Sequence, residues 1–483
     1  MPAEVLVVGA GPTGLVAALL LAARGVPSTV VDRHRGVRPE PRAVHLDGRA
    51  VRILRRAGVG DAFTAVGRPG SGLRMLDARG RPFAEFPRAA RGPDGHAEST
   101  LFHQPDLERV LREAVARQPA ITLREGVGLT GLGPGAVAVL GDAGTRDVAA
   151  VLGCDGAGST VRRLIGARRR DRRFRERWCV LDVRPDGPLT GWGGVEQRCD
   201  RHRPATFVPL PGGRVRFEFR MRPGETVDGL RAALGPLTAS WRGRLPAAAL
   251  HVERAAEYVV RAGVADRWRA GRVLLLGDAA HVTPPFVGQG LGAGLRDADD
   301  ATWKLAAVLR GDPAGEDVLL DSYQREREPD VAAAITGAVR VGRAMAHPRA
   351  AAALRLPAVR RVAERAMEVR RPPGPLVDAP RHRRDPVGTT CPQLTVGGHL
   401  LDDLLDGGWL VLTAGPVPPA LVERADRADR AARAVVLGPD DGGARRWLAG
   451  RGTAAVLLRP DAVVAASAPA RPGDAAQPRS SAA

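Results

Sequence analysis

Glycines at a fixed spacing near the start of the chain could hold a dinucleotide. Gly9, Gly11 and Gly14 form a G-x-G-x-x-G turn between an expected strand, 4–8, and an expected helix. The first glycine permits a tight turn, the second lets the backbone approach a pyrophosphate, and the third lets the helix pack on the strand. Asp32 ends the next expected strand, where its carboxylate can bind ribose hydroxyls. The motif predicts dinucleotide binding, with a glycine-rich turn without ligand as the alternative, and it fits NAD and FAD equally.

A second carboxylate could hold the sugar-alcohol part of a flavin. Gly277-Asp278 follows a buried strand expected over 272–276, and the glycine-rich turn 288–292 then opens a long helix. A carboxylate there can hold ribitol hydroxyls, and backbone N–H groups at the helix start can stabilise a flavin oxygen that gains negative charge on reduction. A helix cap is the alternative role for Asp278. Asp155-Gly156, after another expected strand, adds a third motif.

These motifs need a strand–turn–helix–strand scaffold, and the hydrophobic pattern supplies one. It predicts helices over 13–24, 46–57, 104–116, 291–309 and much of 331–371. Short alternating runs between 178 and 260 predict a half-solvated antiparallel sheet. Near the C-terminus, expected strands over 409–412, 434–437 and 454–458 alternate with helical stretches and indicate a small α/β domain.

Composition narrows the class of protein. With 483 residues and 44% hydrophobic content, the chain can form two or three domains with hydrophobic cores. The net charge of +19 comes almost wholly from arginine, and we attribute it in part to codon usage. The densest cluster, over 162–177, is interpreted as a solvated surface, with attraction of an anionic cofactor or substrate as the alternative. Aromatic content of 4% is too low for a base-stacking surface, so no nucleic-acid partner is expected.

Location and redox state follow from further patterns. No apolar run reaches the roughly 20 residues that span a membrane, and no export signal is recognised. A cytoplasmic location without a membrane partner is therefore expected. Free thiols and no metal site are expected, because C-x-x-C spacing is lacking among Cys154, Cys179, Cys199 and Cys391.

The order of the three motifs resembles the single-component flavoprotein aromatic hydroxylases, the para-hydroxybenzoate hydroxylase class. Within it the chain is most similar to 3-(3-hydroxyphenyl)propionate hydroxylase and related phenol and polyketide hydroxylases, over about residues 4–340. Supporting segments are Pro41-Arg42-Ala43, Gln104 to Arg109, Arg216-Phe217-Glu218-Phe219, Asp278 to Phe286, Asp297-Ala298 and Trp303-Lys304-Leu305. Asp300 stands where relatives often carry Asn. The region from about Cys391 is similar to the thioredoxin-like appendix of some members, but it lacks a C-x-x-C pair, so no redox role is expected.

The resemblance implies non-covalent FAD, with NAD(P)H as a transient co-substrate. Asp278 would hold the ribitol, Asp155 would connect the flavin side to the NAD(P)H path, and the 288–292 turn would lie beside the isoalloxazine. Arg42 and Gln104 would lie along the cofactor. The full set of implied FAD-binding residues is Gly9, Gly11, Pro12, Thr13, Gly14, Asp32, Arg33, Arg42, Gln104, Val127, Asp155, Asp278, Pro285, Gly288, Gly290, Leu291 and Gly292.

Candidates on the substrate side are aromatic residues and one histidine. The aromatic ring of a substrate is expected between the flavin, the Pro284-Pro285-Phe286 segment and a sheet carrying Trp192, Phe207 and Phe219. These three aromatics are equally well explained as the core face of that sheet. His281 could relay a proton from a phenol, and a packed structural histidine is the alternative. No catalytic residue is otherwise assigned, because the flavin would carry the chemistry.

The expected fold is α/β, α+β overall: a Rossmann-like FAD-binding domain, an inserted antiparallel-sheet substrate domain and a small thioredoxin-like domain. The expected divisions are 1–175 and 262–371 for the FAD-binding domain and its helical region, 176–261 for the inserted sheet, 372–390 for a linker, 391–466 for the C-terminal domain and 467–483 for a disordered tail.

The expected function is an FAD-dependent monooxygenase. NAD(P)H would reduce the flavin, O₂ would add to it, and the resulting flavin C4a-hydroperoxide would hydroxylate a phenolic or polyketide-derived ring. Baeyer–Villiger oxygen insertion, epoxidation and a non-oxygenase FAD reductase stay open as alternatives. The substrate, the choice between NADH and NADPH, and the oligomeric state, with a homodimer among the options, are also open.

Overall fold

The computed structural model describes residues 4–37, 43–133, 137–189, 191–311, 315–359, 370–426 and 432–470. The chain divides into two compact units. Unit 1 takes in 1–22, 27–298 and 331–368, and unit 2 takes in 23–26, 299–330 and 369–483. The domain boundaries drawn from the sequence stay predictions.

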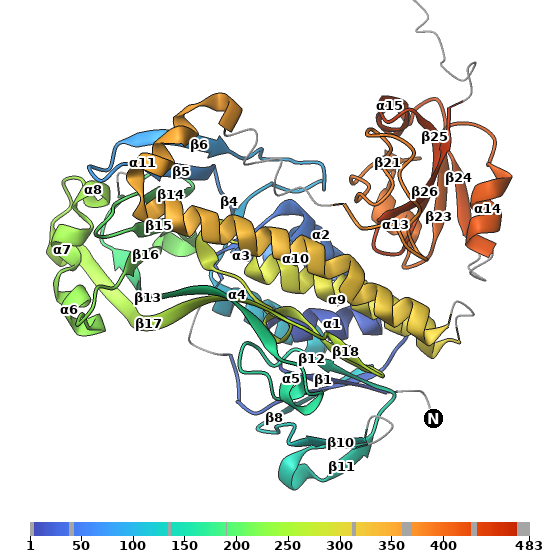
Figure 1. Ribbon diagram of the computed structural model, residues 1–483, viewed down its shortest axis with the longest axis horizontal. Helices are drawn as coiled ribbons and strands as arrows, with labels where there is room; N and C mark the ends of the chain where they lie inside the picture. The colour runs from blue at the N-terminus through green and yellow to red at the C-terminus, as the bar shows by residue number, and fades with distance from the viewer. Residues whose placement is uncertain are drawn as a thin grey trace, which may run out of the picture. The chain divides into compact units, whose positions relative to one another are not determined.

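The first sheet of unit 1 has the strand order β18-β19-β12-β1-β2-β8. Figure 1 labels β1, β8, β12 and β18 of this sheet. Its strands are β1 (Val5–Val8), β2 (Ser28–Asp32), β8 (Ile121–Glu125), β12 (Ala150–Gly153), β18 (Arg269–Ala270) and β19 (Val273–Leu275). All neighbours pair in parallel except β18 with β19. β1, β12 and β19 are buried at every position, as expected for parallel strands covered on both faces. Helix α1 (Pro12–Ala22), which follows β1, is buried at most positions.

The second sheet of unit 1 has the order β20-β17-β13-β16-β15-β14-β5-β6. Its strands are β5 (Gly72–Leu76), β6 (Pro82–Pro87), β13 (Arg169–Pro185), β14 (Val195–Arg198), β15 (Ala205–Pro209), β16 (Val215–Arg220), β17 (Leu250–Ala265) and β20 (His281–Val282). β13, β15, β16 and β17 are antiparallel to their neighbours, as the alternating pattern predicts. The parallel pairing of β14 with β5 connects this sheet to an earlier part of the chain, a join that the sequence pattern did not reveal.

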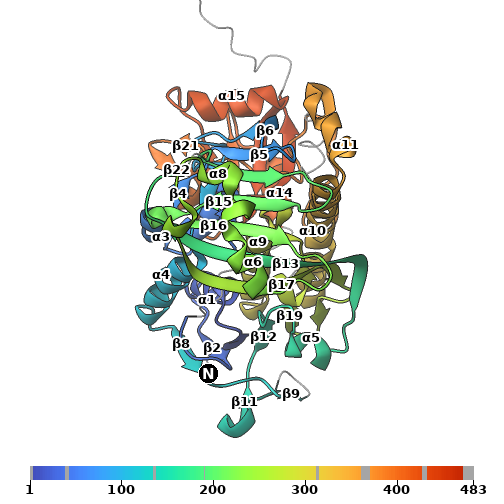
Figure 2. The ribbon, with the colours of Figure 1, turned by 90° about the vertical axis from the view of Figure 1, so that its left-hand side faces the viewer.

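This sheet has two faces, because side chains alternate along each strand. The helix face carries Phe207, Phe217 and Phe219 and packs on Leu230, Leu234 and Trp241 of three short helices. These helices are α6 (Val227–Ala232), α7 (Leu234–Leu237) and α8 (Ala239–Arg242), and Figure 2 looks onto them. The register places Trp178, Gln197 and Glu218 on the opposite face, which we call the turn face.

Unit 1 has further helices and strands among the described residues. They are β3 (His45–Leu46), α2 (Gly48–Arg56), α3 (Gly60–Val66), β4 (Arg68–Pro69), β7 (Thr100–Leu101), α4 (Gln104–Ala116), β9 (Gly131–Leu132), β10 (Val137–Val139), β11 (Thr145–Asp147), α5 (Thr160–Leu164) and α11 (Pro348–Ala351). Two long helices, α9 (Gly290–Leu309) and α10 (Glu316–Ala346), contribute residues to both units. α4 has the predicted bounds, whereas α10 begins well before the predicted 331 and continues through Pro329.

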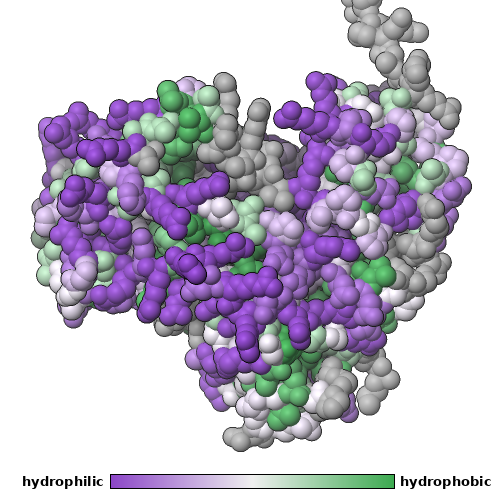
Figure 3. Space-filling view, in the orientation of Figure 1, coloured by the Kyte–Doolittle hydropathy of each residue, from purple (hydrophilic) through white to green (hydrophobic). Residues whose placement is uncertain are grey.

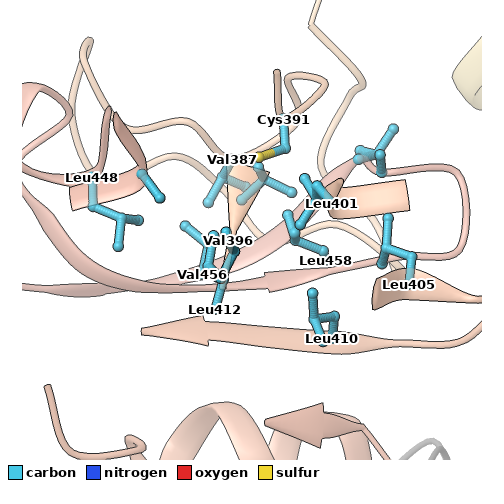
Figure 4. Packing of buried hydrophobic residues seen from close by; sticks show 14 of the residues in the cluster. Val387, Cys391, Val396, Leu401, Leu405, Leu410, Leu412, Leu448, Val456 and Leu458 are labelled. Atoms are coloured by element: carbon cyan, nitrogen blue, oxygen red, sulfur yellow. The ribbon is translucent and has the colours of Figure 1, made fainter. Parts of the chain in front are cut away.

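Unit 2 contains a four-stranded sheet in the order β24-β23-β25-β26. Its elements are β21 (Thr395–Val396), β22 (His399–Leu400), α13 (Leu401–Leu405), β23 (Leu410–Thr413), α14 (Pro419–Asp426), β24 (Arg433–Val436), α15 (Gly442–Gly450), β25 (Thr453–Leu458) and β26 (Val464–Pro469). Figure 4 shows its core, where Leu412 and Val456 from the strands lie with Leu401 from α13. Val377 and Val387, from the segment predicted as a linker, belong to the same core.

One end of the predicted disordered tail is ordered. Ser467 pairs with Val456 in the β25–β26 ladder, so the strand includes residues assigned to the tail from composition alone. The ladder hydrogen bonds outweigh the polar composition there. Residues 471–483 lie outside the described residues.

The surface matches the composition. Figure 3 shows hydrophilic side chains over much of the face in view, as a chain with 26% charged residues requires. Among the described residues, no helix combines the length and the apolar character needed to cross a membrane.

Candidate functional site

The three motifs meet at one edge of the first sheet. Val8, Gly153 and Leu275 lie in one row across β1, β12 and β19, and each is the last residue of its strand. Because the strands are parallel, the residues that follow them leave the sheet on the same side. The glycine turn, Asp155 and Asp278 therefore gather at the carboxyl edge, where open α/β sheets bind their ligands.

Of the three glycines in the G-x-G-x-x-G turn, only Gly11 has open space where a Cβ would lie. Gly9 has φ 111°, and a Cβ there would lie 2.4 Å from the carbonyl oxygen of Cys154. A Cβ on Gly14 would lie 2.0 Å from the carbonyl oxygen of Gly9. A Cβ on Gly11 would have no neighbour within 4 Å. Gly9 and Gly14 are thus required by the fold, whereas Gly11 leaves the start of α1 open to an anionic ligand.

Asp32 holds the turn and the neighbouring loop in place. Its Oδ2 accepts a hydrogen bond from Ala10 N at 2.8 Å, and its Oδ1 accepts one from His34 N at 2.8 Å. Val127 N donates to the carbonyl oxygen of Asp32 at 2.9 Å, and the side chain of Arg33 is exposed and contacts His34. The structure therefore brings Asp32, Arg33 and Val127 together beside the glycine turn.

Asp155 caps the helix that follows it. Its Oδ2 accepts from Thr160 N at 2.6 Å and Val161 N at 3.1 Å, and its Oδ1 accepts from Ser159 Oγ at 2.5 Å. These bonds satisfy backbone N–H groups at the start of α5. A structural capping role, which the sequence did not indicate, is thus present at this position.

Asp297, a residue of α9, connects the Gly277-Asp278 motif to that helix. Its Oδ2 accepts hydrogen bonds from Gly277 N at 3.0 Å and from the Nε2 of His281 at 2.6 Å. His281 is 1% exposed and packs on the Trp268 ring, with centroids 5.3 Å apart. The contacts of His281 support a structural role, because the side chain is enclosed and holds the turn that presents Asp278.

The segment from Pro284 to Gly292 joins the motif to α9. Pro285–Val287 forms a 3-10 turn, and Gly288 takes φ 63°, where a side chain would meet the His45 ring. The helix then begins at Gly290, so Leu291 and Gly292 belong to its first turn. A Cβ on Gly294 would lie 2.6 Å from Thr13 Oγ1, which places this helix against the start of α1.

Phe286 is the contact between this turn and the second sheet. Its ring lies 5.9 Å from that of Phe174 and 5.2 Å from that of Trp178, between centroids. Its carbonyl oxygen accepts a hydrogen bond from Gln197 Nε2 at 2.6 Å. The turn face of the sheet therefore faces the segment that leads to α9.

The predicted aromatic lining lies on the other face. Phe207 and Phe219 share the register of Phe217 and Cys179 and are enclosed beneath α6–α8. Trp192 lies under the guanidinium of Arg74, 4.5 Å away. The prediction that Phe207 and Phe219 face Phe286 is wrong, because strand alternation points them away from it, and their explanation as sheet core is correct.

Gln104, a further predicted residue, lies at the start of α4. Gln104 Oε1 accepts from Ala43 N at 2.7 Å, and its Nε2 donates to Glu108 at 2.8 Å. Arg42 lies outside the described residues. Asp47, which caps α2, forms an ion pair with Arg296 of α9 and so joins this region to the same helix.

Comparison with known proteins identifies the family. The model of the FAD binding domain family matches residues 2–338. The chain belongs to this family. It is 29% identical to a probable NADH-specific resorcinol 4-hydroxylase of Rhodococcus jostii, over 95% of this chain and 91% of that one. It is 35% identical to a 3-(3-hydroxy-phenyl)propionate/3-hydroxycinnamic acid hydroxylase of Burkholderia vietnamiensis, over 69% of this chain and 61% of that longer protein.

A solved structure has the same fold over nearly the whole chain. An aklavinone-11 hydroxylase with FAD and aklavinone superimposes with a TM-score of 0.77 at 26% identity, covering 96% of this chain and 95% of that one. The resemblance drawn from the motifs, the FAD cofactor and the α/β fold class are thereby confirmed. The protein is an FAD-dependent oxidoreductase.

The geometry fits FAD on features of this chain alone. The open position at Gly11 and the N-terminus of α1 suit a pyrophosphate. The carboxylates of Asp32 and Asp278 lie at the same sheet edge, where sugar hydroxyls can donate to them. FAD supplies the redox chemistry when bound, and the chain supplies its binding and orientation.

Proposed function

We propose that the protein hydroxylates a phenolic or polyketide-derived aromatic substrate, using NAD(P)H and O₂. The observation that carries this proposal is the single sheet edge at which the glycine turn, Asp155 and Asp278 converge. The names of the relatives support it, since one acts on resorcinol, another on hydroxyphenylpropionate and a third on aklavinone.

Particular residues take roles in this proposal. Gly11 and the start of α1 hold the FAD pyrophosphate, Asp32 the ribose and Asp278 the ribitol. The 288–292 turn lies beside the isoalloxazine, and Phe286 lies on the substrate side of the site. Pro12, Thr13, Arg33, Arg42, Gln104, Val127 and Asp155 complete the cofactor surroundings.

Substrate-stimulated turnover tests the function. Purified holoenzyme is given NADH or NADPH with resorcinol, 3-(3-hydroxyphenyl)propionate or aklavinone. We expect one of these compounds to accelerate NAD(P)H oxidation and to yield a hydroxylated product with little peroxide, because an occupied site excludes water. Oxidation that no compound accelerates would favour an FAD reductase, and a ring-expanded product would favour Baeyer–Villiger insertion.

Replacing Asp278 tests the cofactor placement. Asp278→Ala should weaken FAD binding by about tenfold to a hundredfold, since each charge-assisted hydrogen bond contributes roughly 1.5–3 kcal/mol. Titration of apoprotein with FAD measures the change. Asp61→Ala, at an exposed carboxylate in α3, is the matched control and should bind FAD as the wild type does. Equal affinity in the two variants would contradict the role of Asp278.

A further inference from the structure

An acidic residue lies in the row of side chains that reaches the Phe286 turn. Val180, Glu218, Thr206 and Gln197 stand opposite one another across β13, β16, β15 and β14. Opposed residues of antiparallel strands point to the same face. Gln197 donates to the carbonyl oxygen of Phe286, so this row faces the turn. Glu218 is therefore a carboxyl group on the substrate side of the proposed site, two strands from Gln197.

Glu218 is enclosed, and Tyr258 is a hydrogen-bond donor to it. The residue is 6% exposed. Tyr258, in β17, donates a hydrogen bond from its Oη to Glu218 Oε2 at 3.3 Å. Arg216 Nη1 lies 4.0 Å from Oε1, which is too long for a hydrogen bond. The carboxyl group is thus oriented by Tyr258 while it keeps capacity to accept another donor.

Arg216 lies nearer to Asp182 than to Glu218. Arg216 binds Asp182 through two nitrogens, at 2.7 Å and 3.1 Å. Arg254 also lies 3.7 Å from Asp182. The closest of these contacts go to Asp182, so Glu218 shares Arg216 with a second carboxylate.

The electrostatic setting suits proton transfer. Burial raises the pKa of Glu218, and the opposing effects of Arg216 and of the Tyr258 hydrogen bond do not cancel that rise. Burial and Glu218 raise the pKa of Tyr258 well above its usual value, so Tyr258 stays protonated as a donor. A carboxyl group whose pKa is shifted toward neutral pH can act as a general base.

We propose that Glu218 is the base that accepts the proton of the substrate's phenolic hydroxyl, with Tyr258 as its positioning residue. The phenolic O–H bond breaks, the proton binds a carboxylate oxygen of Glu218, and the electron pair stays on the phenolate oxygen. The electron-rich ring then reacts faster with an electrophilic oxygen. This inference rests on the proposed function and assigns the base that the motifs left open.

The test measures the pH dependence of kcat/KM for a phenol that the wild-type holoenzyme hydroxylates. Glu218 acts when deprotonated, so activity should fall as the pH drops through its pKa. Glu218→Gln should lose this acid limb and about a hundredfold or more of kcat/KM at neutral pH, with FAD content unchanged. Tyr258→Phe removes a bond that lowers the pKa of Glu218, so it should move the acid limb to higher pH.

Glu196→Gln is the matched control. Glu196 lies in the same sheet at 4% exposure, but on the helix face, where it accepts a hydrogen bond from Trp241 Nε1 at 2.8 Å. Its pKa is also raised by burial. Glu196→Gln should therefore disturb packing to a similar degree while it keeps the wild-type acid limb.

The outcomes separate this inference from the function itself. A Glu218→Gln enzyme with a wild-type pH profile overturns the role of Glu218, as does an equal loss in Glu196→Gln. If Glu218→Gln does not retain FAD, Tyr258→Phe decides, and an unmoved acid limb overturns the proposal. A wild type that hydroxylates no phenol contradicts the proposed function instead.

Discussion

Gly11→Val should yield a folded protein that does not retain FAD. A Cβ at this position meets no protein atom within 4 Å, so the fold tolerates the side chain. The same space is where the pyrophosphate approaches the start of α1, and the valine side chain would fill it. Flavin absorbance after gel filtration measures retention, and the thermal unfolding of apoprotein measures the fold.

Two other glycines make this result specific. Gly14→Val should fail to fold, because its Cβ would lie 2.0 Å from the carbonyl oxygen of Gly9. Gly337→Val is the matched control in α10, where a Cβ also meets nothing within 4 Å, and it should keep FAD. Normal FAD content in Gly11→Val would mean that the pyrophosphate lies elsewhere.

Arg459→Met should destabilise unit 2 by about 3–5 kcal/mol, the usual effect of removing one partner from a buried ion pair. Arg459 is 0% exposed and donates to Asp461 at 2.6 Å and to Asp300 at 3.0 Å. Its Nη1 also lies 2.8 Å from Glu326. The substitution leaves these carboxylates buried with fewer cations. Thermal unfolding and limited proteolysis measure the loss.

The same cluster gives a pH dependence. Burial alone would raise the pKa of Glu326, but Arg459 and Lys304 outweigh it and lower that pKa to about 2. A carboxyl group with a lowered pKa stabilises the folded state above its unfolded pKa, and this contribution is lost as the pH falls toward about 2. Arg459→Met should weaken this dependence, whereas Arg446→Met, at an exposed arginine of α15, should match the wild type. Equal stability of the two variants would contradict the account of the cluster.

The sequence predicted those parts of the site that depend on local pattern. G-x-G-x-x-G needs only a strand, a turn and a helix, and Gly9, Gly11 and Gly14 lie in such a unit in the structure. α4 has the predicted bounds because it has a proline in its first turn and an amphipathic pattern.

Long-range pairing could not be predicted in the same way. Alternation along a strand shows that the strand has two faces, but it does not show which face meets Phe286. The sequence therefore left Phe207 and Phe219 as candidates for the substrate side. The register with β13 and β14 decides this, and it turns Glu218 and Gln197 toward the turn. Only Glu218 carried a sequence signal, as a charged residue between two phenylalanines in a buried strand.

Asp300 shows the same limit. It stands where relatives often carry Asn, a difference that has no visible meaning in the sequence. In the structure it contacts Lys304 at 2.9 Å and Arg459 at 3.0 Å, although 159 positions separate it from Arg459. The carboxylate therefore belongs to the ion cluster of unit 2, and no local pattern could predict its contact with Arg459.

The most direct test of the central claim is hydroxylation under isotopically labelled O₂. The wild-type holoenzyme is incubated with NAD(P)H and the phenol that most accelerates its oxidation, and the product is analysed by mass spectrometry. We expect hydroxylation by O₂ to place one labelled oxygen atom in the product for each NAD(P)H consumed in coupled turnover. A product that carries oxygen from water, or NAD(P)H oxidation with peroxide alone for every phenol tested, would contradict it.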